Sequence, residues 1–135
     1  LQRRMTSMAA STSSGRWKTA PTLLGGGFDV ATMSALFQRS SAVVSMRLHA
    51  LVLAASLSVP LLAIPYDPKV SALLTDLAYP LASLDRNVAG APLFDRLWED
   101  RAALAAALGP AVEPLARRAS DAFDKLAALA GGATA

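Results

Sequence analysis

Two short apolar segments, each followed by a helical pattern, constrain the fold of this chain more than any other feature. Residues 41–46 and 61–66 are predicted to be buried strands, because each is a short apolar run bounded by serine or proline. Helices are predicted for residues 47–58, which are mostly Leu and Ala, and after Asp67, where Pro68 suits a first helical turn. Strands that alternate with helices pair in parallel, so we expect an α/β fold with part of a Rossmann-like sheet.

Further helices are predicted on both sides of this unit. Asp29 can cap a short helix that precedes the first strand, and residues 81–84 are a candidate third strand. A helix is expected to begin at Pro92 and to end at Gly109-Pro110, where the last helix would start. This last helix has an apolar face made of Val112, Leu115, Ala119, Phe123 and Leu126.

The composition fits a single folded domain without thiol or metal chemistry. The 135 residues are 53% hydrophobic, which is enough for a core, and none is cysteine. One histidine cannot supply a metal-ligand set or a Ser-His-Asp triad with confidence, so we expect no metal site and no cofactor. The net charge of +3 comes from basic residues before Asp29, and no cluster of basic and aromatic residues indicates nucleic-acid binding.

The longest uncharged stretch runs from Arg47 to Asp67, with 19 residues between them. That length approaches the roughly 20 residues that a membrane-spanning helix needs. Pro60 and Pro65 would interrupt such a helix, and the stretch divides more naturally into a helix, a turn and a strand. We therefore expect no transmembrane span.

Residues 1–28 differ in composition from the rest of the chain. They are rich in Ser, Thr, Met and Gly and contain no acidic residue. This composition is similar to that of a transit peptide, and it also fits a flexible tail or a stretch translated outside its proper frame. We expect residues 1–28 to be an atypical, disordered segment and residues 29–130 to form one partial domain.

Two groups of polar side chains follow the two predicted strands. Arg47 and His49 come after the first strand, and Tyr66 and Lys69 come after the second. Ligands bind at the carboxyl ends of the strands in open α/β sheets, where helix N-termini favour phosphate. Arginine binds phosphate or carboxylate, and histidine donates protons near neutral pH. The same residues also fit capping or solvated positions, so spacing alone leaves both interpretations open.

The string from Ser45 to Lys69, SMRLHALVLAASLSVPLLAIPYDPK, resembles the signature region of polysaccharide pyruvyl transferases of the bacterial cell-wall type. The following VSALLTDLAYP and the later LWEDR run, with its helical tail, extend the resemblance from Asp29 to Leu129. The combination of Arg-x-His with a downstream Tyr-x-x-Lys is the specific part.

This resemblance implies two Rossmann-like lobes of GT-B type, with this chain as a C-terminal fragment that lacks the first lobe. The family transfers a pyruvyl group from phosphoenolpyruvate to two hydroxyls of a sugar. The resemblance implies that Arg47, Lys69 and Tyr66 bind phosphoenolpyruvate and that His49 is catalytic. It also implies a cell-wall glycan or lipid-linked sugar as acceptor in the full-length enzyme, and a cytoplasmic location that includes the inner face of the membrane. We expect little or no activity from the fragment alone.

Two other hypotheses stay open at this point. The chain also fits the donor-binding half of a GT-B glycosyltransferase that uses a nucleotide sugar. A non-catalytic, truncated remnant with exposed apolar surface is the third hypothesis.

Overall fold

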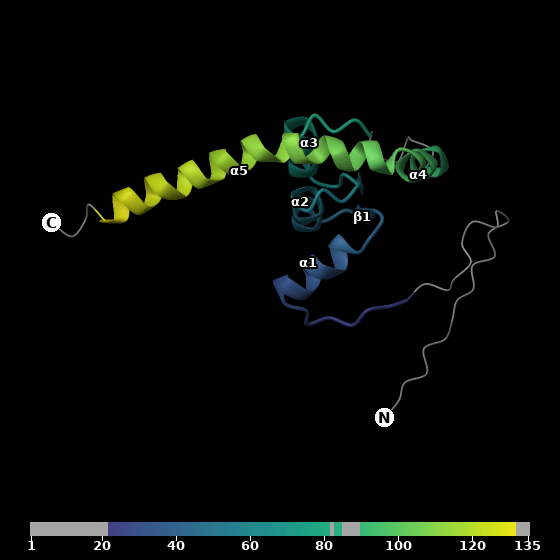
Figure 1. The fold of residues 1–135 in the computed structure, drawn as a ribbon, viewed down its shortest axis with the longest axis horizontal. Helices are drawn as coiled ribbons and strands as arrows, with labels where there is room; N and C mark the ends of the chain where they lie inside the picture. The colour runs from purple at the N-terminus through teal and green to yellow at the C-terminus, as the bar shows by residue number, and fades with distance from the viewer. Residues whose placement is uncertain (1–21, 82, 85–89, 132–135) are drawn as a thin grey trace, which may run out of the picture.

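The computed structural model describes residues 22–81, 83, 84 and 90–131, and its regular elements are shown in Figure 1. The expected segment 1–28 lies mostly outside these residues. The elements in chain order are α1 (Val30–Gln38), β1 (Val43–Ser45), α2 (Leu48–Ser56), β2 (Leu61–Ala63), α3 (Pro68–Asp76), α4 (Gly90–Glu99) and α5 (Arg101–Gly131).

Strands β1 and β2 form a parallel pair, which confirms the predicted mixed α/β class. Val43 lies opposite Leu61, and α2 connects the two strands. Both strands are shorter than predicted. All three residues of β2 are buried, whereas β1 is only half-buried and Val44 is 42% exposed. The prediction of a buried first strand is therefore wrong. Among the described residues, β1 pairs with a neighbouring strand along one edge only.

The third strand predicted for residues 81–84 is absent from the part of that segment that the structure describes, and residue 82 lies outside it. One backbone contact occurs where such a strand would pair: the N–H of Leu84 donates to the carbonyl oxygen of Ala63 at 2.8 Å. A single bond of this kind does not extend into a ladder, so the described residues of this segment lie in a loop beside β2.

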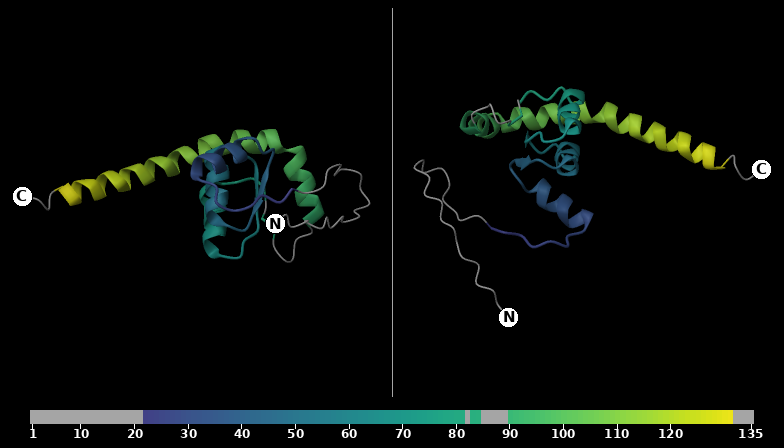
Figure 2. Two further views of the ribbon diagram at one scale, coloured as in Figure 1. Left: turned by 90° about the horizontal axis from the view of Figure 1, so that it is seen from below. Right: turned by 180° about the vertical axis from the view of Figure 1, so that it is seen from behind.

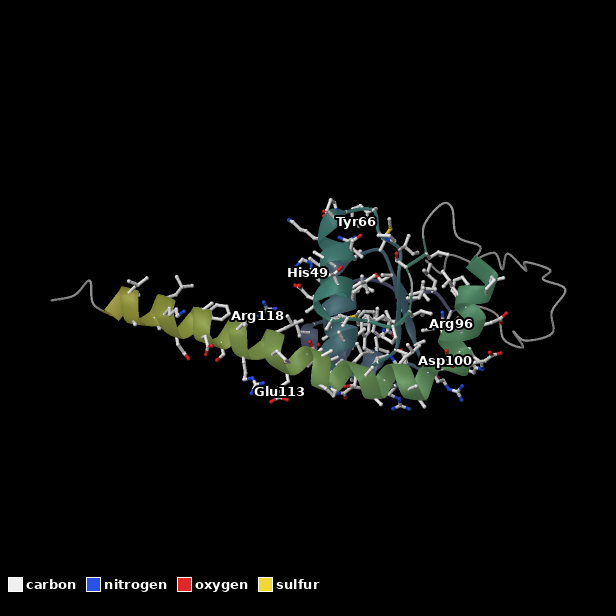
Figure 3. All side chains as sticks on the ribbon, turned by 90° about the horizontal axis from the view of Figure 1, so that it is seen from above. His49, Tyr66, Arg96, Asp100, Glu113 and Arg118 are labelled. Carbon is white, nitrogen blue, oxygen red and sulfur yellow. The ribbon has the colours of Figure 1, made fainter. Side chains whose placement is uncertain are left out.

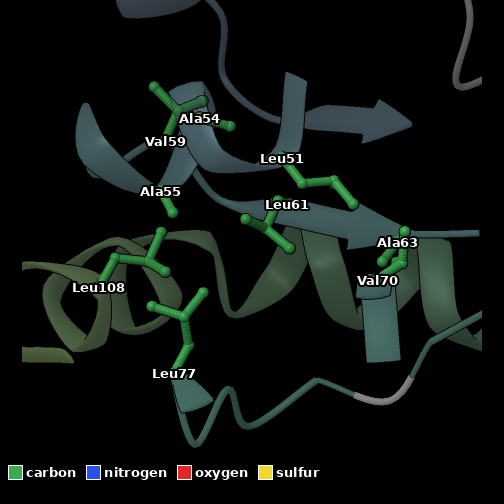
Figure 4. Close-up of a cluster of buried hydrophobic side chains, with 9 residues drawn as sticks. All are labelled: Leu51, Ala54, Ala55, Val59, Leu61, Ala63, Val70, Leu77 and Leu108. Carbon is green, nitrogen blue, oxygen red and sulfur yellow. The ribbon is translucent and has the colours of Figure 1, made fainter. Parts of the chain in front are cut away.

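The main hydrophobic core lies between α2, β2, α3 and the first half of α5 (Figure 4). Leu51, Leu61, Val70 and Leu108 are fully buried in it. Each comes from a different element. Displacing any one of these elements would therefore expose apolar side chains of the others to water. Burying a leucine or valine side chain stabilises the fold by about 1.5–3 kcal/mol.

A second cluster lies on the opposite face of β2. Successive side chains of a strand point to opposite sides, so Leu62 points away from the side that Leu61 and Ala63 occupy. Leu62 packs with leucines of α4 and α5 and of the loop after α3, namely Leu81, Leu93, Leu97 and Leu104. Strand β2 is thus covered on both faces, which explains its continuous apolar sequence.

Two helices begin at the predicted aspartates. The carboxylate of Asp29 accepts a hydrogen bond from the N–H of Thr32 at 2.8 Å, and that of Asp67 accepts one from the N–H of Lys69 at 2.8 Å. The bonds from Thr32 hold the pKa of the Asp29 carboxyl below its ordinary value. Both caps depend on local chemistry alone, which is why the sequence could predict them.

The start of β2 depends on a side chain distant in sequence. The N–H of Leu61 donates to the hydroxyl oxygen of Tyr79 at 3.0 Å. Burial raises the pKa of Tyr79, although the hydrogen bond from Leu61 acts in the opposite direction. The loop after α3 is therefore attached to the sheet through this hydroxyl.

The predicted helix break at Gly109-Pro110 is wrong. The chain turns at Asp100 instead, and α5 then continues through Pro110 and Pro114. The turn at Asp100 lets α4 and α5 run in different directions while both supply leucines to the second cluster (Figure 1).

Packing explains why α5 continues through its prolines. Leu108, Ala111, Val112 and Leu115 lie on both sides of the prolines and all pack against the main core. Each proline removes one helical hydrogen bond, but both prolines are exposed, so water can reach the freed carbonyl groups.

The second half of α5 projects from the body as an arm (Figures 1 and 2). Residues 116–130 are all exposed, including the apolar Phe123, Leu126 and Leu129. Among the described residues, no helix has both the length and the apolar character that crossing a membrane requires.

Candidate functional site

The candidate site lies at the edge of the sheet where β1 and β2 both end. The two strands are parallel and in register, so the residues that follow them emerge at the same edge. Arg47 is the N-cap residue of α2, and Asp67 is the N-cap residue of α3. The fold thus brings together the two groups of residues that the sequence identified.

His49 and Lys69 occupy equivalent positions in their helices. Each is the second residue of its helix, two positions after the N-cap. Tyr66 directly precedes the cap of α3, and Figure 3 shows His49 and Tyr66 on the side of the body away from α5. The strand–helix unit therefore repeats, with a histidine in the first turn of one helix and a lysine at the same position in the next.

Ser45 contributes to this corner, and sequence reasoning did not assign it a role. Its hydroxyl oxygen accepts a hydrogen bond from the N–H of Arg47 at 3.0 Å. A serine that bonds to the backbone two residues later stabilises a tight turn. The signal in the sequence is the Ser-Met-Arg spacing at the end of a strand. Ser45 therefore fixes the direction in which the chain enters α2.

The N-termini of α2 and α3 differ in their capping. Asp67 caps α3 and places a carboxylate there, whereas Arg47 makes no side-chain cap at α2. The N–H groups of Leu48 and His49 have no acceptor among the described residues. Free N–H groups and the helix dipole both favour an anion. The start of α2 is consequently the better place for a negatively charged ligand.

The candidate residues are open to solvent. Arg47, His49 and Lys69 are exposed, and Tyr66 is 65% exposed. Within the described part of the chain, the side chains of Arg47, His49 and Lys69 make no hydrogen bond or ion pair. They are thus available to a ligand, but the described residues do not enclose them.

One open hollow of about 560 Å³ lies elsewhere, beside the C-terminal half of α3. Thr75, Tyr79 and Ser83 are among its lining residues. Lys69 is the second residue of α3, and neither it nor any other candidate residue lines the hollow. We find no group of three His, Asp or Glu side chains that could hold a metal ion in the ranges that the structure describes.

The fold and this corner define a parallel α/β unit with cationic side chains at its strand ends. Comparison with protein families gives a match of residues 21–68 to the family described as polysaccharide pyruvyl transferase. Over this segment the chain is similar to the polysaccharide pyruvyl transferase family, which is the family that the sequence resemblance predicted. No curated protein and no solved structure matches the chain.

The matched segment covers most of the candidate site. It includes Arg47, His49 and Tyr66 and ends at Pro68, one residue before Lys69. It begins within the segment 1–28 that the sequence set apart by composition. The resemblance predicted for residues 69–129 lies outside the match and stays a prediction.

Proposed function

We propose that the corner formed by Arg47, His49, Tyr66 and Lys69 binds phosphoenolpyruvate and takes part in pyruvyl transfer to a polysaccharide. The observation that carries this proposal is the uncapped N-terminus of α2, which lies between Arg47 and His49 within the segment matched to the family. Phosphoenolpyruvate is a small trianion, and this corner offers free N–H groups and cationic side chains to a ligand of that charge.

The two helix starts take different parts in this proposal. The phosphate group binds at α2, where the N–H groups of Leu48 and His49 are free. The carboxylate of Asp67 repels an anion from the start of α3. Lys69 offsets this repulsion, because it extends a positive charge from the adjacent helix toward the same edge.

The reaction requires a proton donor and stabilisation of negative charge. A proton adds to the methylene carbon of the enol, and the adjacent carbon becomes cationic and forms bonds to two sugar hydroxyl oxygens. The phosphate leaves with the electrons of its C–O bond, and the two hydroxyl protons are released. We assign the proton donation to His49, and we assign phosphate binding to Arg47 and Lys69. Tyr66 completes the donor-binding set.

The wider context of the proposal comes from the family. We infer that the acceptor is a cell-wall glycan or a lipid-linked sugar and that the reaction takes place in the cytoplasm or at the inner face of the membrane. We also infer that this α/β unit is part of a Rossmann-like lobe of GT-B type. The described residues leave the four side chains exposed, and catalysis requires groups held at reactive distance. We therefore expect the 135-residue chain to bind the donor but to transfer it slowly.

The test is a titration of the isotopically labelled chain with phosphoenolpyruvate, followed by amide NMR. The expected result is a set of shifts centred on Leu48 and His49 that is weakened roughly tenfold by Arg47→Ala or Lys69→Ala, because each loses a charge-assisted bond. Lys125→Ala removes the same kind of charge from the exposed arm and serves as the matched control.

Two outcomes decide against the proposal. Shifts at α2 that respond equally to Lys125→Ala and Lys69→Ala indicate nonspecific anion binding. Stronger binding of a nucleoside diphosphate than of phosphoenolpyruvate indicates a nucleotide-sugar donor instead. The role of His49 is tested separately with His49→Gln. If His49 only binds phosphate, this variant weakens the binding of phosphoenolpyruvate. If His49 donates the proton, the variant leaves binding nearly unchanged and slows phosphate release in a longer, active chain.

A further inference from the structure

The arm of α5 carries an apolar face that continues the face buried in the core. Leu108, Val112 and Leu115 pack against the main core, with spacings of four and three residues. The same alternation continues along the exposed arm through Ala119, Ala122, Leu126 and Leu129. An alternation of three and four residues is the pattern by which one helix packs along another. The arm therefore presents a helix-packing seam that the described residues leave uncovered.

We propose that the seam is covered by the arm of a second copy of this chain, in antiparallel orientation. The seam is self-complementary, because its first two residues are alanines and its last two are leucines. When two arms run in opposite directions, Ala119 faces Leu129 of the other copy and Ala122 faces Leu126. Every layer then combines one small and one large side chain, which gives four layers of equal volume.

The position of the body excludes the parallel arrangement. In each copy the body covers the apolar face of α5 from Leu108 to Leu115, and the three- and four-residue spacing continues this face along the arm. Two parallel helices would bring both bodies onto the same stretch of the paired helices, where they would collide. Two antiparallel helices place the bodies at opposite ends, so only the arms meet.

The flanks of the seam agree with this arrangement in part. Phe123 lies beside the seam, and the two copies of Phe123 approach each other near the two-fold axis, which suits an aromatic pair. Arg118 and Lys125 lie along the other flank, and the two copies of Lys125 repel each other there. Both cations are exposed and long, so they can point away into water, and salt should strengthen the dimer.

The area available sets the expected strength. Phe123, Leu126 and Leu129 are 72%, 60% and 74% exposed, so most of the surface of each is available to a partner. Covering these side chains and the alanines between them in both copies removes on the order of 1,000 Å² from water. This is the lower limit for a specific interface, so we expect a dimer with a Kd of roughly 10–100 µM.

The first test measures the mass of the full chain by sedimentation equilibrium over a range of concentrations. The wild type should shift from monomer to dimer, and Leu126→Asp should weaken dimerisation at least tenfold, because it places a charge in the seam. Ala127→Asp adds the same side chain on the outer face of the arm and should have no such effect. Both positions are exposed and distant from the core, so circular dichroism should show an unchanged body.

The second test determines the orientation. The chain contains no cysteine, so engineered thiols report without background. An equimolar mixture of Ala122→Cys and Leu126→Cys should form mainly the mixed disulfide on mild oxidation. Two copies of Ala122→Cys are offset by four residues, about 6 Å along the axis, in addition to the separation of the helices. Their Cα atoms thus lie beyond the roughly 7 Å that a disulfide spans.

Three outcomes would overturn the proposal. The first is a chain that stays monomeric at about 1 mM, where a Kd in the expected range requires mostly dimer. The second is a dimer that Leu126→Asp and Ala127→Asp weaken equally. The third is a preference for either homodisulfide over the mixed one. A monomer whose arm binds vesicles of anionic lipid would identify a membrane surface as the occupant instead.

Discussion

Replacing Tyr79 by phenylalanine removes one oxygen atom and, with it, the acceptor for the N–H group at the start of β2. The aromatic ring keeps its volume, so the contacts of Tyr79 with both hydrophobic clusters are retained. The N–H of Leu61 loses a bond of 3.0 Å, and the Leu61 residue is fully buried. The substitution therefore isolates the cost of one unsatisfied backbone donor.

The expected magnitude follows from that burial. A buried polar group without a partner costs about 1–3 kcal/mol, whereas an exposed hydroxyl contributes little. Tyr66 supplies the control, because its side chain is 65% exposed and makes no hydrogen bond to the described residues. We expect Tyr79→Phe to lower the free energy of unfolding by about 1–3 kcal/mol and Tyr66→Phe to change it by less than about 0.5 kcal/mol.

The pH dependence provides a second measurement on the same residue. Burial raises the pKa of Tyr79 above its ordinary value of 10.0, so the folded state holds the phenolic proton more tightly than the unfolded state. The resulting stability is complete below pH 10 and is lost as the pH rises through the folded-state pKa. Tyr79→Phe has no phenolic proton at this position, so its stability does not fall for this reason as the pH rises. The difference in stability between wild type and variant should therefore shrink above pH 10.

The assay is urea unfolding followed by circular dichroism at neutral and alkaline pH. Because the chain has two tyrosines, Tyr66→Phe also allows the ionisation of Tyr79 to be followed alone by ultraviolet absorbance. Equal stability of wild type and Tyr79→Phe would refute the reasoning, since it would mean that Leu61 finds another acceptor. Ionisation of Tyr79 at or below its ordinary pKa would contradict the burial argument.

Two further predictions concern α5 and the helix ends. Leu108→Ala should lower the free energy of unfolding by about 2–5 kcal/mol in the same assay, because Leu108 is fully buried. Leu126→Ala is the control in the exposed arm and should lower the free energy of unfolding of the monomer far less. Ala78 follows α3 with a φ of 45°, a left-handed backbone conformation that glycine adopts more easily than alanine. Ala78→Gly should therefore stabilise the chain by roughly 0.5–1 kcal/mol, and lower stability of this variant would contradict the backbone argument.

The sequence alone determined the features that depend on near neighbours. Asp29 and Asp67 cap their helices through bonds to residues two or three positions away, and such bonds form wherever the local pattern occurs. The α/β class followed from alternating apolar segments, because burial imposes that pattern directly. Arg47 and His49 were identified as candidates for a similar reason, since a polar pair after a predicted strand indicates the start of a helix at the sheet edge.

Only the tertiary structure decided the features that depend on distant contacts. Gly109-Pro110 resembles a local helix end, yet α5 continues because Leu108, Val112 and Leu115 pack against the core on both sides of the prolines. Residues 81–84 have the composition of a strand, but Leu84 bonds to β2 only once.

The equivalence of His49 and Lys69 likewise depends on the tertiary structure, because it requires β1 and β2 to pair in register. An interior proline costs a helix about 3 kcal/mol, and burial contributes about 1.5–3 kcal/mol for each large apolar side chain. Several such side chains pack on both sides of Pro110 and Pro114, so packing prevails there.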